Sequence, residues 1–167
     1  MKRILMITVA MLPLMLMAQA RIGIVNSQQI FELMPEKVAA EAQLKALSEK
    51  YHAEYELLRG EFDKKYADYQ TVAADASMPE TIKERRVQEL QESDKKMREF
   101  ERKVADDLAA RRKALTQPIT DKIHAAIRAA GEQGGFDVVF DTAVTPVAYT
   151  GPNTIDMTAM VKSLLGL

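Results

Sequence analysis

The chain has 167 residues with 23 basic and 24 acidic side chains, which gives a net charge of −1. This balance argues against a nucleic-acid binder that works mainly by neutralising phosphates. The sequence contains no cysteine, so disulfides are excluded, and neither G-x-x-x-x-G-K-[ST] nor G-x-G-x-x-G occurs, which argues against nucleotide-driven chemistry.

Residues 1–20 have the pattern of a secretory signal peptide. Lys2 and Arg3 give a positive start, an uncharged apolar run follows, and residues 18–20 form an A-x-A cleavage site. The apolar run is shorter than the roughly 20 residues that a membrane span needs, and a proline interrupts it. We therefore expect cleavage and export, with Arg21 starting a mature chain that carries 21 basic and 24 acidic side chains.

The next segment, residues 21–35, predicts a strand and a short helix that belong to a small body. Residues 22–25 are short, apolar and rich in β-branched side chains, which is typical of a strand. Asn26 or Ser27 can cap the helix that follows. The apolar side chains of this helix are Ile30, Phe31 and Met34.

Residues 36–133 have the composition of long helices, because more than half of them are Ala, Glu, Lys, Leu or Arg. Pro35 and Glu36 suit the start of the first helix. Its apolar side chains recur at spacings of three and four, but many are aromatic and one position is a lysine. We therefore expect a loose apolar stripe and not a tight zipper. The two rows are Leu44, Tyr51, Leu58, Lys65 and Val72, and Tyr55, Phe62 and Tyr69.

The chain is expected to turn back near residues 75–80. Ser77 and Glu80 have the spacing of a capping box, which predicts the start of a second helix. The short connection favours antiparallel pairing with the first helix. Pro118 predicts a kink or a junction, because it removes one hydrogen bond from the helix. The helical-hairpin arm is therefore assigned to residues 36–117.

The C-terminal part of the body is assigned to residues 118–167. The second helix is expected to stop at the glycine pair 134–135. Residues 136–141 and 146–149 are candidate strands, because β-branched and aromatic residues cluster there. Asp156 can cap a final helix.

The predicted fold is therefore α+β and mostly helical, with a small three-stranded α/β body and a long antiparallel helical-hairpin, coiled-coil-like arm. So small a body with exposed strand edges is marginally stable alone, and we expect it to associate with itself through the strands. The candidate residues for this contact are Ile22, Ile24, Val138, Val139, Phe140 and Val147.

Residues 21–26 open the mature chain with a strand, and residues 136–141, 147–149 and 155–158 close it with a strand, an acidic turn, a strand and a D-x-T helix start. These two ends resemble the opening strand and the closing segment of the Skp/OmpH family of periplasmic chaperones. The resemblance implies a trimer whose strands build a central body, with three helical arms around a cavity. Many family members are markedly basic, whereas this mature chain is slightly acidic.

On this resemblance we predict an ATP-independent periplasmic holdase that binds unfolded outer-membrane proteins and prevents their aggregation. The alternative is a structural coiled-coil spacer or adaptor of the cell envelope. No enzyme activity, cofactor or nucleic-acid partner is expected, and membrane contact is at most peripheral. His52 and His124 stand singly, which argues against a metal site, and the adjacent Asp106 and Asp107 diverge by about 100° on a helix.

Two groups of side chains on the arm are candidates for client contact. Its aromatic and methionine side chains either pack the two helices together or face a cavity, where they suit promiscuous apolar binding. The basic side chains near the hairpin tip either form a salt-bridged surface or meet acidic clients or lipid. The first group is Tyr51, Tyr55, Phe62, Tyr66, Tyr69, Met97 and Phe100, and the second is Lys83, Arg85 and Arg86.

Overall fold

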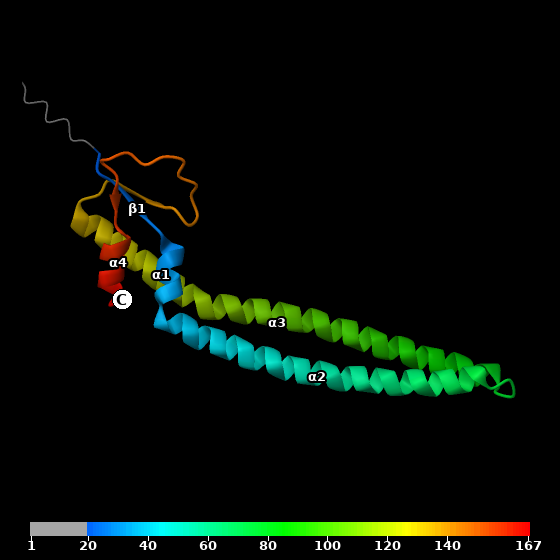
Figure 1. Cartoon of the computed structure of the whole chain (residues 1–167). Helices are drawn as coiled ribbons and strands as arrows, with labels where there is room; N and C mark the ends of the chain where they lie inside the picture. Colours follow the sequence, from blue (N-terminus) through cyan, green and yellow to red (C-terminus); the bar gives the residue numbers. More distant parts are fainter. Residues whose placement is uncertain (1–19) are drawn as a thin grey trace, which may run out of the picture.

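The computed structural model describes residues 20–167, so residues 1–19 of the predicted signal peptide lie outside it. A small body is built from both ends of the described chain, and a long helical hairpin projects from it (Figure 1). This confirms the predicted fold class. The elements in chain order are β1 (Ile22–Val25), α1 (Ser27–Leu33), α2 (Pro35–Ala74), α3 (Glu80–Gly134), β2 (Val138–Asp141), β3 (Ile155–Asp156) and α4 (Thr158–Leu165).

The arm consists of α2 lying antiparallel to the first two thirds of α3 (Figure 1). Every member of the two predicted rows on α2 is half-buried, which confirms the loose stripe. Lys65 fits into this stripe because its Nζ donates a hydrogen bond of 2.6 Å to Ser93 Oγ on α3. Ser93 is buried, so the pair satisfies two polar groups that face each other between the helices.

The predicted capping box at the hairpin turn is wrong. The amide and hydroxyl of Ser77 both donate to Asp75 Oδ1, at 2.8 and 2.6 Å. Because that hydroxyl is bonded to Asp75, it does not reach the start of α3. Pro79 is the N-cap there, and no side chain caps the helix. The turn itself lies where the sequence predicts it.

Pro118 does not end or divide the second helix, since α3 is unbroken from Glu80 to Gly134. The helix changes course where the arm joins the body (Figure 1). The hydroxyls of Thr116 and Thr120 donate to carbonyl oxygens one turn earlier, which commonly bends helices. The arm and the body therefore share one continuous helix.

The strands of the described residues form a parallel sheet in the order β2-β1-β3. The predicted strand at residues 146–149 is wrong: these residues lie in a connection without regular structure, and β3 at Ile155–Asp156 takes the free edge of β1. Pro146 has no N–H for a sheet hydrogen bond, which argues against a paired strand there.

The hydrophobic core lies in the body, between the sheet, α1, α4 and the final turns of α3. Gly23 on the central strand permits this packing, because a Cβ there would meet Met157 Sδ and approach Phe136 Cδ1 at 3.1 Å. Asn26 caps α1 by accepting from the Gln29 amide at 2.9 Å, as one of the two predicted candidates. The most deeply buried side chains are Val25, Ile30, Met34, Ile123, Met157 and Val161.

Candidate functional site

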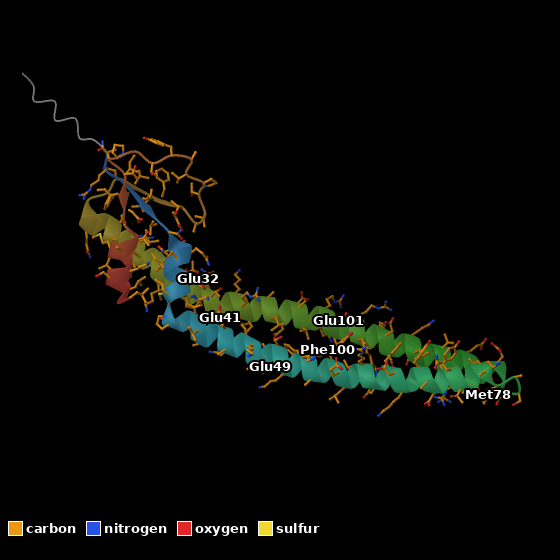
Figure 2. All side chains as sticks on the ribbon, viewed as in Figure 1. Glu32, Glu41, Glu49, Met78, Phe100 and Glu101 are labelled. Atoms are coloured by element: carbon orange, nitrogen blue, oxygen red, sulfur yellow. The ribbon has the colours of Figure 1, made fainter. Side chains whose placement is uncertain are left out.

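An apolar groove opens between the two helices at the middle of the arm. Its volume is about 410 Å³. The register of the antiparallel hairpin brings together two stretches of chain that are about fifty residues apart, and Phe100 lies between the helices (Figure 2). We call this feature the mid-arm groove. It is lined by Ser48, Tyr51, His52 and Tyr55 of α2 and by Phe100, Glu101, Val104, Ala105 and Leu108 of α3.

The aromatic side chains of the mid-arm groove are fixed by contacts across the hairpin. The Tyr51 ring meets Phe100 edge to face, with the centroids 6.1 Å apart. The Tyr51 hydroxyl donates to Asp107 Oδ2 at 2.6 Å, and this hydrogen bond raises the pKa of Tyr51. The carboxylate of Glu101 raises the pKa of Tyr55 in the same way. The groove thus combines aromatic walls with an acidic rim.

The remaining aromatic candidates lie outside the mid-arm groove. Phe62 and Met97 are half-buried between the helices, and Tyr66 stacks on Phe62 with the ring centroids 6.3 Å apart. Tyr66 remains 46% exposed. Tyr69 lines a second, more polar hollow near the turn, whose volume is about 590 Å³. The structure therefore brings together three of the seven candidates and spreads the other four along the arm.

The basic candidates lie at the start of α3, close to the turn. Arg85 Nε and Arg86 Nη1 bond to the same carboxylate of Glu89, at 3.2 and 2.7 Å. Arg86 is the main cause of a lowered pKa of Glu89, and Arg85 adds to it. Lys83 is half-buried beside Tyr69 in the hollow near the turn. Part of the basic charge is thus paired within the helix itself, as in the salt-bridged alternative.

The sheet presents an apolar face on the side away from the core. Ile22 is paired with Val138, and Ile24 with Phe140, so these four side chains share one face. Ile22, Val138 and Phe140 are 37%, 45% and 40% exposed. Val139 points to the opposite face and packs against the core. Val147 lies in the connection between β2 and β3.

Sequence reasoning missed the two carboxylates that bond to the tyrosines of the mid-arm groove, of which Glu101 lines the groove and Asp107 lies beside it. Asp107 was set aside because its carboxylate diverges from that of Asp106, yet it accepts the hydrogen bond of Tyr51 across the hairpin. Glu101 carried no motif at all. The only available signal was the register of the hairpin, which places the first helix opposite residues 100–108 and cannot be set without knowing where the turn is.

The described residues hold neither a metal site nor a membrane-spanning helix. Within residues 20–167, no three or more His, Asp or Glu side chains gather as a metal ion would require. None of the helices in that range has the length and apolar character needed to cross a bilayer. The candidate functional surfaces of the described residues are therefore the mid-arm groove, the basic residues near the hairpin turn and the exposed face of the sheet.

The model of the family described as "Outer membrane protein (OmpH-like)" matches residues 21–165. The chain belongs to the OmpH-like family. This match begins at Arg21, after the predicted cleavage site, and includes the body, the arm and the mid-arm groove.

A solved structure has the same fold as this OmpH-like chain. It comes from Caulobacter crescentus CB15 and is described as a "putative outer membrane chaperone (OmpH-like)". The TM-score is 0.67 at 17% sequence identity, and the match covers 89% of this chain and 85% of the other. No curated protein matches the sequence. With so few identical residues, the shared feature is the body with its helical hairpin and not a set of side chains.

Proposed function

We propose that this OmpH-like protein is an ATP-independent holdase chaperone of the periplasm that binds unfolded outer-membrane proteins with its arms. The observation that carries the proposal is the mid-arm groove, where aromatic side chains of an otherwise highly charged hairpin are only half-buried. Membership of the OmpH-like family and the description of the Caulobacter relative support the chaperone role.

The chemistry of the arm suits weak binding to many sequences. Tyrosine and phenylalanine rings offer broad apolar contact. The polar side chains that line the groove are too few to form a converging set that would select one ligand. Shallow contacts repeated along a helix roughly 60 Å long hold a client at several points and release it when it folds. Neither nucleotide nor cofactor is needed in this scheme.

We further propose that the apolar face of the sheet joins three copies of the chain. Ile22, Ile24, Val138 and Phe140 form a contiguous patch on a body too small to be robust by itself. Burying this patch against other copies places three arms around one space, which turns a shallow groove into part of a cavity.

The test of the proposed function is suppression of aggregation. A urea-unfolded outer-membrane barrel protein is diluted into buffer with and without residues 21–167, in the absence of nucleotide, and light scattering is followed. A holdase suppresses scattering for several unrelated barrels at about one oligomer per client. Unchanged scattering with every client contradicts the proposal and favours a spacer or adaptor with one folded partner.

A pair of variants assigns the binding to the mid-arm groove. Tyr55→Ser removes one aromatic wall of the groove, whereas Leu57→Ser removes an apolar side chain that is 72% exposed elsewhere on α2. We expect the first to weaken the Kd for an unfolded client by about fivefold or more, as for the loss of a central apolar contact, and the second to leave it nearly unchanged. Circular dichroism of both variants checks that the arm is intact.

A further inference from the structure

The backbone nitrogen of Arg21, the first residue after the predicted cleavage site, lies directly beside a carboxylate. It donates to Asp137 Oδ2 at 2.6 Å, and the Asp137 amide in turn donates to the Arg21 carbonyl oxygen at 2.9 Å. The Arg21 guanidinium lies over the Phe136 ring, 4.6 Å from its centroid. Three contacts thus join the residue before β1 to the two residues before β2.

Signal-peptide cleavage changes the chemistry of one of these contacts. Hydrolysis of the Ala20–Arg21 bond adds water across it, leaving a carboxylate on Ala20 and a new α-amino group on Arg21, which is protonated at neutral pH. A neutral amide donor becomes an ammonium with three N–H groups at the same position. A hydrogen bond between two charged groups is stronger than one in which only the acceptor is charged.

We propose that the new α-ammonium group of Arg21 forms an ion pair with Asp137, so that removal of the signal peptide completes the body. β1 is the central strand and pairs with β2 and β3 on its two sides. The ion pair fastens the start of this strand to the start of β2. The uncleaved chain has only the neutral amide donor at this position, so its body is less stable and unfolds more readily during export.

The position of the contact makes it specific to one cleavage site. One additional residue would move the ammonium about 3.8 Å along the chain and return a neutral amide to Arg21. Cleavage one residue later would remove Arg21 and all three of its contacts. The structure therefore distinguishes the product that begins at Arg21 from its neighbours.

The experiment compares purified chains with defined N-termini, each released from a fusion by a protease that leaves no extra residue. Residues 21–167 contain every buried side chain of the core and are compared with residues 20–167, each with Asp137 and with Asp137→Asn. Because the contact is exposed, we expect the chain beginning at Arg21 to melt about 2–4 °C higher at low salt. Protomer concentration is held constant because association also shifts Tm.

Two controls separate an ion pair from a general effect of chain length. The difference in Tm should disappear in Asp137→Asn and shrink in about 1 M salt, where exposed charges are screened. Asp106→Asn makes the same change of charge far away on the arm and should preserve the difference. Equal Tm values for the two chain lengths, or a difference that survives Asp137→Asn, would overturn the proposal. Neither outcome bears on the holdase assay.

Discussion

The body of the protein buries side chains completely, whereas the arm buries them only halfway. Six large side chains of the body are almost fully inaccessible, including Ile30 and Ile123. In the arm, between residues 41 and 117, Ser93 alone is buried, and the apolar stripe of α2 stays half-exposed along its length. The two regions share α3, so one helix passes from a closed core into an open, two-helix layer.

This difference in burial indicates that the body and the arm have different roles. A tightly packed core has one arrangement and resists deformation. A pair of helices with shallow contacts on one side opens or bends at lower cost, and local unfolding is expected where buried apolar contacts are few. The body thus gives the chain a stable base, and the arm keeps apolar side chains available for contact.

The largest expected effect compares the same truncation in the two regions of one helix. Ile123 of α3 is 2% exposed in the body, and Leu108 is half-buried beside the mid-arm groove. Ile123→Ala should lower the free energy of unfolding by about 2–5 kcal/mol, because it removes contacts and leaves a cavity. Leu108→Ala should cost roughly 1–2 kcal/mol, since less apolar surface is lost.

Urea denaturation followed by circular dichroism measures both values. Hydrogen exchange shows where each variant loosens the fold. We expect Ile123→Ala to reduce protection throughout the body and Leu108→Ala to reduce it only along the arm. Equal losses for the two variants would show that the arm is as tightly packed as the body, which would remove the basis of the comparison.

The second expected effect concerns the glycine of the central strand. A Cβ at Gly23 would meet Met157 Sδ and crowd Phe136, both in the packed body. Gly23→Ala should therefore destabilise the protein by about 1–3 kcal/mol, as overpacking does in other cores. Thermal unfolding measures the loss. Met157→Ala in the same chain should restore part of the stability if the clash is the cause.

The sequence predicted the parts of this fold that depend on local chemistry. The strand at residues 22–25, the cap at Asn26, the hairpin turn and the stop at Gly135, which has the positive φ of 61°, all follow from nearby residues. The errors arise where distant segments compete. β3 forms at residues 155–156 because the free edge of β1 is there, and no local pattern reports that edge.

The candidate site was predictable only in part for the same reason. The aromatic stripe of α2 was visible as a 3–4 spacing, and Phe100 was among the candidates for client contact. The pairing of Tyr51 with Asp107, which are 56 positions apart in the sequence, depends on the register of the two helices. A shift of the turn by a few residues would give Tyr51 a different partner, so side-chain spacing along one helix cannot identify it.

The third expected effect is a gain of stability at the glycine of the arm. Nothing lies within 4 Å of a Cβ built on Gly60, in contrast to Gly23. Gly60→Ala should therefore stabilise the protein by about 0.5–1 kcal/mol, because alanine favours a helix. If the arm flexes at Gly60, Gly60→Ala should narrow the distribution of distances between spin labels at the turn and in the body, relative to the unsubstituted chain. An unchanged distribution would contradict a hinge at this position.

The smallest expected effect is a change in the pKa of Tyr51 in the mid-arm groove. Asp107 holds the pKa of Tyr51 above its ordinary value. The hydrogen bond therefore stabilises the fold below about pH 10, and this stabilisation disappears as the hydroxyl deprotonates at the raised pKa. Asp107→Asn should return the pKa of Tyr51 toward about 10, measured by ultraviolet absorbance. Tyr51→Phe identifies the signal of this residue.

The arm should keep its hydrogen-exchange protection from pH 6 to 9 and lose it near the groove at higher pH, while the body retains its protection. Loss of protection in the body at the same pH would show that the two regions open together, and the mid-arm groove would then have no independent motion with which to accommodate a client.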